Sequence, residues 1–141
     1  MRVFHDGFCH VHKSITRENV IAAKKVHPDA LVLAHPECTG EVLETADFIG
    51  STSEIIDYAT ESEKEKFIIC TEMGIFYELG QKNPKKKFYS VGHRQFCPNM
   101  KRISVEKVLQ ALENLQPQVE IPEEIARKAA IPLERMMELA K

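Results

Sequence analysis

The sequence predicts a three-layer α/β/α sandwich with a mostly parallel sheet, plus helices at the C-terminal end. The first observation is a series of short apolar runs, the clearest of which is Leu31 to Ala34. Continuous apolar runs of this length are typical of strands that are covered on both faces. The second observation is that stretches with helical spacing alternate with these runs. Such alternation indicates βα units and therefore parallel strands.

Each expected strand is a short apolar run that stops at a turn or at charged residues. In chain order, the expected strands are residues 2–5, 31–34, 48–49, 67–70 and 88–91. The helices are indicated by capping residues at their starts and by prolines, which disfavour a helical conformation in the preceding residue. In chain order, the expected helices follow Thr16, span 41–46 and 54–60, begin at Ile75, follow Ser104, begin at Pro122 and follow Pro132. The apolar face of the helix after Ser104 needs a surface on which to pack.

The composition is that of an ordinary globular domain. The chain has 141 residues, of which 43% are hydrophobic and 28% charged, and its formal net charge is −2. No basic stripe interleaves with aromatic residues, so nucleic acid is not an expected partner. No apolar run approaches the roughly 20 residues that cross a membrane, and the first residues lack a signal-peptide pattern. We therefore expect no membrane partner and a cytoplasmic location.

The four cysteines are widely spaced and form no Cys-x-x-Cys pair. This pattern gives poor support to a zinc ribbon or a disulfide framework. Three interpretations stay open for each: a core thiol, a catalytic thiol, or a ligand that the fold brings to a common site. Cys70 closes an apolar run and is expected in the core, whereas Cys38 is expected in the core or lining a pocket. Cys9 and Cys97 stand in polar, loop-like sequence, which favours ligands.

Two polar loops follow predicted strands and form the candidate site. His35-Pro36-Glu37 begins where the 31–34 run stops, and Pro36 cannot continue a sheet ladder. The turn Gly50-Ser51-Thr52-Ser53 opens a helix and offers N–H groups and hydroxyls that suit an anion. In α/β proteins, loops at the carboxyl ends of strands line ligand sites. The loops therefore predict a site with an acid/base group on one side and an anion cradle on the other.

An ordered set of motifs over nearly the whole chain resembles quinolinate synthase. The motifs are Phe8-Cys9-His10-Val11-His12, Pro28-Asp29-Ala30 through His35-Pro36-Glu37, Ala46-Asp47-Phe48-Ile49-Gly50-Ser51-Thr52-Ser53, Thr71-Glu72-x-Gly74-Ile75, Cys97-Pro98-x-Met100 and Ile131 to Met137. Any one of these motifs is weak, but the set in this order is specific. The resemblance implies an enzyme that condenses iminoaspartate with dihydroxyacetone phosphate to quinolinate, in de novo NAD biosynthesis. It also implies a [4Fe-4S] cluster held by three cysteines, with one iron open to substrate as a Lewis acid.

The resemblance assigns roles to individual residues. Cys9 and Cys97 match the second and third cluster cysteines. His35, Pro36 and Glu37 match substrate-binding residues, and Glu37 also matches the group expected to transfer protons. Thr52 matches a further substrate contact. His12 is expected near the cluster, while the resemblance leaves the role of Glu72 open, because a carboxylate at a helix start is explained equally well by the helix dipole.

The family's chains are longer than this one, and the part without a counterpart is N-terminal. That part carries the first cluster cysteine, so this chain is expected to be a C-terminal portion, inactive alone and completed by a complementary N-terminal half. We expect residues 1–14 to end a preceding domain, 15–92 to form the sandwich, and 93–141 to form the Cys97 loop and terminal helices. Two alternatives stay open: a non-catalytic module that binds phosphate or a dicarboxylate, and a small protein that binds zinc or another metal structurally.

Overall fold

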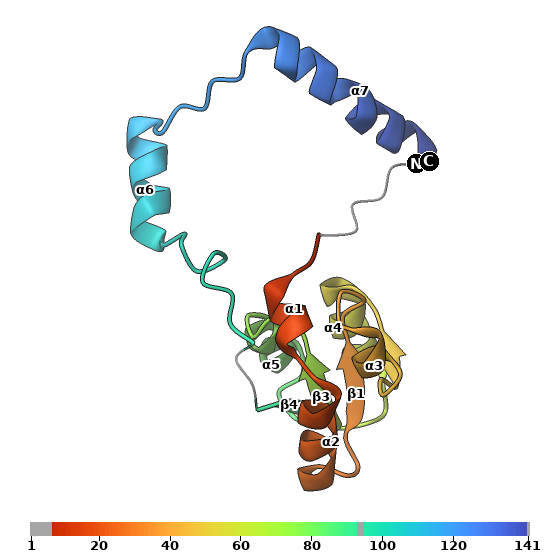
Figure 1. Cartoon of the computed structure of the whole chain (residues 1–141). Helices are drawn as coiled ribbons and strands as arrows, with labels where there is room; N and C mark the ends of the chain where they lie inside the picture. Colours follow the sequence, from red (N-terminus) through yellow and green to blue (C-terminus); the bar gives the residue numbers. More distant parts are fainter. Residues whose placement is uncertain (1–6, 93–94, 141) are drawn as a thin grey trace. The chain divides into compact units, whose positions relative to one another are not determined.

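A computed structural model describes residues 7–92 and 95–140 of the chain (Figure 1). The chain divides into two compact units, Met1–Asn99 and Met100–Lys141. The first unit contains the sheet, and the second contains two helices. The expected strand at 2–5 lies outside the described residues. The domain boundaries expected after residues 14 and 92 stay predictions.

The first unit is built on a four-stranded parallel sheet, as the sequence predicts. The strands are β1 (Leu31–Ala34), β2 (Phe48–Ile49), β3 (Lys66–Cys70) and β4 (Lys87–Ser90). Their order across the sheet is β2-β1-β3-β4, with every neighbouring pair parallel. Ala34 is in register with both Ile49 and Cys70. The ends of β2, β1 and β3 therefore reach the same edge of the sheet.

Helices cover both faces of this sheet, which confirms the three-layer architecture. The helices of this unit are α1 (His10–Ser14), α2 (Arg17–Val26), α3 (Gly40–Leu43), α4 (Thr52–Glu61) and α5 (Ile75–Lys82). Val32 and Ile68 pack with residues of α2 and α3 in one buried cluster. Leu33 and Ile69, their neighbours in sequence, pack with residues of α4 and α5 in a second cluster. Successive residues of a strand point to opposite faces, so these apolar runs fill both cores.

The helix starts follow the capping signals, with one exception. Thr16 caps α2, because its hydroxyl accepts the Asn19 N–H and the Asn19 side chain accepts the Thr16 N–H. In the turn expected to open a helix, Ser51 is the N-cap of α4 and Thr52 is the first helical residue. The Ser51 hydroxyl accepts the Glu54 N–H, and the Glu54 carboxylate accepts the Ser51 N–H, which forms a capping box. The sequence does not predict helix α1, and Cys9 is its N-cap residue, with extended backbone just before the first helical turn.

The second unit contains α6 (Val105–Asn114) and α7 (Glu123–Leu139). Ser104 caps α6 as expected, by accepting the Lys107 N–H. The two helices expected around Pro132 are instead one, with Pro132 inside it. Proline removes one N–H from the helix, which leaves the carbonyl four residues earlier without its partner. None of the α7 residues is buried, so water can donate the missing hydrogen bond to that carbonyl. The apolar face of α6 is exposed, and no described helix is long and apolar enough to cross a membrane.

Candidate functional site

The loops that follow β2, β1 and β3 lie side by side at the carboxyl edge of the sheet. The Gly50 N–H donates to the Ala34 carbonyl at 3.1 Å, and the His35 N–H donates to the Cys70 carbonyl at 3.2 Å. These bonds extend the sheet ladder into the loops. The loop 35–38 is therefore flanked on one side by the Gly50 turn and on the other by Thr71 and Glu72. The two polar loops that the sequence singled out are neighbours.

His12 connects this edge to α1. It is a buried residue whose Nδ1 lies 2.9 Å from Glu37 Oε2 and whose Nε2 lies 2.8 Å from Thr71 Oγ1. Burial lowers the pKa of His12, and the neighbouring His35 lowers it further, although Glu37 acts in the opposite direction. A neutral imidazole has one donor and one acceptor nitrogen. An ionised carboxylate only accepts, so we assign Nδ1–H to Glu37 and the Thr71 hydroxyl as donor to Nε2.

His35 and Glu37 occupy one tight turn. The Cys38 N–H donates to the His35 carbonyl at 3.0 Å, which closes the turn around Pro36. The Glu37 N–H donates to His35 Nδ1 at 3.2 Å, and the rings of His35 and His12 stack with centroids 4.3 Å apart. The Glu37 side chain is 56% exposed. Its carboxylate is therefore fixed by His12 and still open to a ligand.

Cys9 and Cys97 reach the site from opposite ends of the first unit. The ligand atoms of Cys9, His12 and Glu37 all lie within 4.8 Å of one another. The Cys97 N–H donates to Glu72 Oε1 at 3.2 Å, and Glu72 Oε2 accepts the Gly74 N–H at 2.6 Å. Both cysteines are half-buried. The structure thus attaches both predicted ligands to the same edge, one through α1 and one through Glu72.

The other two cysteines lie deeper in the protein than Cys9 and Cys97. Cys38 and Cys70 are both buried, and the core position expected for Cys70 is confirmed. Burial raises the pKa of Cys38 to about 11 and that of Cys70 to about 12. A thiolate is the form that ligates metals, and burial makes the thiolate harder to form at Cys38 and Cys70 than at a half-buried cysteine. The described residues therefore offer two half-buried thiols, Cys9 and Cys97, of the three that the expected cluster requires.

Gln95 anchors the segment that leads to Cys97, and sequence reasoning missed it. Its side chain is buried, donates to the carbonyls of Ile69 and Thr71 at 2.7 Å and 2.6 Å, and accepts the Val91 N–H at 3.1 Å. Its own carbonyl accepts the Met73 N–H at 2.7 Å. No periodicity or motif distinguishes this glutamine from a surface one. Glu72 was noticed in the sequence, but its bond to the Cys97 N–H depends on tertiary structure.

The turn that contains Thr52 is partly occupied by the protein itself. The Ser51 N–H donates to the Glu54 carboxylate at 2.7 Å, and these bonds from Ser51 lower the pKa of Glu54. The N–H groups of Thr52 and Ser53 stand in the first turn of α4, where a helix supplies no acceptor. Gly50 is required here because a Cβ would lie 2.9 Å from the Glu54 Cβ. The turn keeps donors for an anion, but Glu54 places a negative charge beside them.

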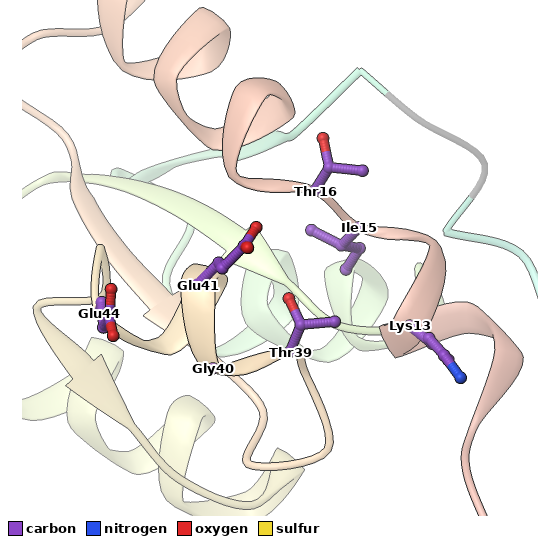
Figure 2. Close-up of a pocket in the computed structure, with 7 residues that line it drawn as sticks. All are labelled: Lys13, Ile15, Thr16, Thr39, Gly40, Glu41 and Glu44. Atoms are coloured by element: carbon purple, nitrogen blue, oxygen red, sulfur yellow. The ribbon is translucent and has the colours of Figure 1, made fainter.

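A pocket in the first unit lies next to these residues rather than among them. It has a volume of about 540 Å³ and lies between α3 and the connection from α1 to α2 (Figure 2). The residues that line it are Lys13, Ile15, Thr16, Thr39, Gly40, Glu41 and Glu44. None of the predicted site residues is among them. We place the site at the open sheet edge, because the side chains of His12, Glu37 and Thr71 are in contact with one another there.

Comparison with known proteins identifies related sequences. Residues 1–138 match the family model described as Quinolinate synthetase A protein. A quinolinate synthase of Caldicellulosiruptor saccharolyticus is 47% identical, over 98% of this chain and 46% of the relative. The quinolinate synthase of Thermodesulfovibrio yellowstonii is 45% identical, over 95% of this chain and 44% of the relative. Quinolinate synthase 2 of Methanosarcina acetivorans is 44% identical, over 95% of this chain and 43% of the relative. The chain spans a little less than half the length of these relatives.

Proposed function

The chain belongs to the quinolinate synthase family, and we propose that it supplies one part of the site that condenses iminoaspartate with dihydroxyacetone phosphate to quinolinate. Because the chain spans less than half of its relatives, we propose that activity requires the remainder of a family-length enzyme. The observation that carries this proposal is the convergence of Cys9, His12 and Glu37 with the loops after β1 and β3. A reaction with two substrates and several proton transfers needs such a set of different groups in one place.

Glu37 is the proposed acid/base group. Forming the pyridine ring requires a base that takes protons from carbon and an acid that protonates departing hydroxyl groups. The Glu37 carboxylate is held through Oε2 by His12 and is exposed enough to meet a substrate. The hydrogen bond from His12 favours one rotamer of the Glu37 side chain. The His12 ring is itself fixed by Thr71 and by stacking on His35. His12 and Thr71 are therefore positioning residues in this proposal.

His35, Pro36 and Thr52 are the proposed substrate contacts. The His35 Nδ1 accepts the Glu37 N–H, so a neutral His35 carries its proton on Nε2 and can donate it to a substrate carboxylate. Pro36 holds the turn that presents both side chains. Thr52 offers its hydroxyl and N–H at the start of α4, where the helix dipole favours a phosphate or carboxylate.

Cys9 and Cys97 are the proposed cluster ligands of this chain. When bound, a [4Fe-4S] cluster with three cysteine ligands supplies an open iron that acts as a Lewis acid toward substrate oxygens. The two other thiols of the chain are buried, which raises their pKa and makes them poorer ligands, so we expect the third ligand to come from outside this chain. Glu72 and Gln95 fix the backbone on which Cys97 stands.

The experiment is anaerobic reconstitution with iron and sulfide of residues 1–141 mixed with the N-terminal half of a full-length relative. We expect a cluster of about four irons in the mixture and much less iron on this chain alone. Cys9→Ser and Cys97→Ser should each abolish uptake, whereas the core variant Cys70→Ala should keep it. Equal iron and sulfide in all variants, or none in the mixture, would overturn the assignment of the ligands.

A non-catalytic module that binds phosphate or a dicarboxylate is the weaker candidate. Its expected cradle is the turn before α4, and there the Glu54 carboxylate already accepts the Ser51 N–H. One N–H of the turn is therefore already taken, and this candidate gives no role to the convergence of Cys9, His12 and Glu37. This candidate predicts that phosphate raises the melting temperature without iron, which thermal denaturation with and without phosphate would measure.

A further inference from the structure

Three different metal-binding groups converge where α1 begins. The ligand atoms of Cys9, His12 and Glu37 lie within 4.8 Å of one another. Cys9 and His12 are one helical turn apart, and Glu37 comes from the loop after β1. Thiolate, imidazole and carboxylate are the three side-chain ligand types of Zn²⁺ in proteins. We propose that this trio binds a single zinc ion in the chain by itself, with the fourth position open to water.

The spacing of the donors fits a tetrahedral ion after small side-chain movements. Ordinary zinc–ligand bond lengths place neighbouring N, O and S donors about 3.4 to 3.6 Å apart. The His12 Nδ1 and Glu37 Oε2 are 2.9 Å apart and have to separate by about half an ångström. No pair has to approach by more than about 1.4 Å, given the 4.8 Å limit. The Glu37 side chain is 56% exposed, so it can rotate to make this adjustment.

The hydrogen bonds of His12 already provide what a zinc-bound histidine needs. Such a histidine donates its second ring N–H to an oxygen, which fixes its orientation. The His12 Nε2 lies 2.8 Å from Thr71 Oγ1, and a hydroxyl can both donate and accept. Without metal, Nδ1–H donates to Glu37 and the Thr71 hydroxyl donates to Nε2. With zinc, Nδ1 gives its lone pair to the ion and Nε2–H donates to Thr71. The ring changes tautomer and keeps its place.

The charges of the site also match a divalent cation. The Cys9 thiolate and the Glu37 carboxylate carry two negative charges, and His12 is a neutral ligand. His12 is buried and stacks on His35, which limits rotation of its ring. Cys9 is half-buried as the N-cap residue of α1. A neutral, partly desolvated site of this kind binds zinc more tightly than scattered surface groups do.

This zinc site shares Cys9, His12 and Glu37 with the site proposed above, but it does not depend on the proposed function. The Cys97 thiol takes no part in it, whereas a cluster requires both Cys9 and Cys97. Zinc and a cluster need the same Cys9 thiolate, so the two occupancies exclude each other. The test below uses no iron, sulfide or substrate, and its failure would leave the proposed enzyme function standing.

The test titrates Zn²⁺ into reduced, metal-free chain 1–141 against a chromophoric chelator and repeats the titration with Co²⁺. We expect one zinc per chain, and a thiolate-to-cobalt charge-transfer band that is missing in Cys9→Ser. Cys9→Ser and His12→Gln should each weaken zinc binding by at least about 100-fold, and Thr71→Val by about 10-fold or more. Glu37→Gln should weaken it as well, and because Glu37 lies in an exposed turn this variant should keep the fold. Circular dichroism of each variant establishes that it is folded.

The matched control is Cys97→Ser, which removes the other half-buried thiol and should leave zinc affinity unchanged. If Cys97→Ser weakens zinc binding as much as Cys9→Ser does, the site is a pair of thiols and the proposal fails. It fails equally if folded Glu37→Gln and Thr71→Val bind zinc as tightly as the original chain. The proposal also fails if the original chain binds zinc no more tightly than Cys9→Ser does.

Discussion

Gln95→Leu removes the side chain that ties the Cys97 segment to the sheet. The Gln95 amide makes three hydrogen bonds to the backbone, with Ile69, Thr71 and Val91, and the residue is only 3% exposed. A typical hydrogen bond contributes about 1 kcal/mol to stability, and a buried group left unpaired costs about 1–3 kcal/mol. We therefore predict that Gln95→Leu lowers the free energy of unfolding by about 3 kcal/mol or more. That is a large share of the roughly 5–15 kcal/mol by which domains are stable.

The assay is urea unfolding followed by circular dichroism, with the slope of the transition compared between variants. Gln81→Leu is the matched control, because Gln81 is exposed on α5 and its replacement should change stability by no more than about 0.5 kcal/mol. A second readout is alkylation of Cys97 in native buffer, which should become faster when Gln95 no longer holds the segment. If Gln95→Leu is as stable as Gln81→Leu, the three bonds do not hold the segment and the reasoning is refuted.

Three further predictions concern the turn before α4 and the cysteines. Gly50→Ala should destabilise the chain, because its Cβ would meet the Glu54 Cβ at 2.9 Å. Gly80→Ala in α5 is the control: its Cβ would meet nothing within 4 Å, and the variant should be more stable by about 0.5–1 kcal/mol. Equal melting temperatures of the two variants would contradict this. A thiol reagent should label the two half-buried cysteines quickly and the two buried ones only in denaturant, and fast labelling of all four would show that the core is open. Burial raises the pKa of Cys70 to about 12 in the folded chain. Above about pH 9 the thiol therefore ionises only in the unfolded chain, and the free energy of unfolding should fall by up to about 1.4 kcal/mol per pH unit. Between about pH 8 and 11, the free energy of unfolding should therefore depend less on pH in Cys70→Ala than in the original chain.

The sequence predicted the sheet well because each strand is decided by local pattern. Leu31 to Ala34 is apolar at every position, as a strand with two covered faces must be, and the structure places β1 at these residues. The caps at Thr16 and Ser104 were also visible, because a hydroxyl at that position satisfies an N–H of the next turn. The turn Gly50–Ser53 predicts the start of α4, but three of its residues have hydroxyls, so local pattern does not single out Ser51 as the cap.

What the sequence could not supply depends on contacts between distant residues. The short helix α1 has no periodicity of its own, and its buried His12 is fixed by Glu37 and Thr71, which lie 25 and 59 residues away. Gln95 is recognisable only through the carbonyls that it meets. The local rule for proline predicts a break between helices at Pro132, because that rule takes no account of whether water can bond to the exposed backbone. The positions of Cys9 and Cys97 followed from the family resemblance, and their roles stay predictions.

Quinolinate formation tests the central claim most directly. Residues 1–141, reconstituted anaerobically together with the N-terminal half of a relative, are supplied with iminoaspartate and dihydroxyacetone phosphate, and quinolinate and phosphate are counted. We predict that the mixture forms both products and that Glu37→Gln lowers the rate by about 10²- to 10⁴-fold, which is what loss of a general acid/base removes. If a mixture that holds its cluster forms no quinolinate, or if Glu37→Gln is as active as the original chain, the proposed site is wrong.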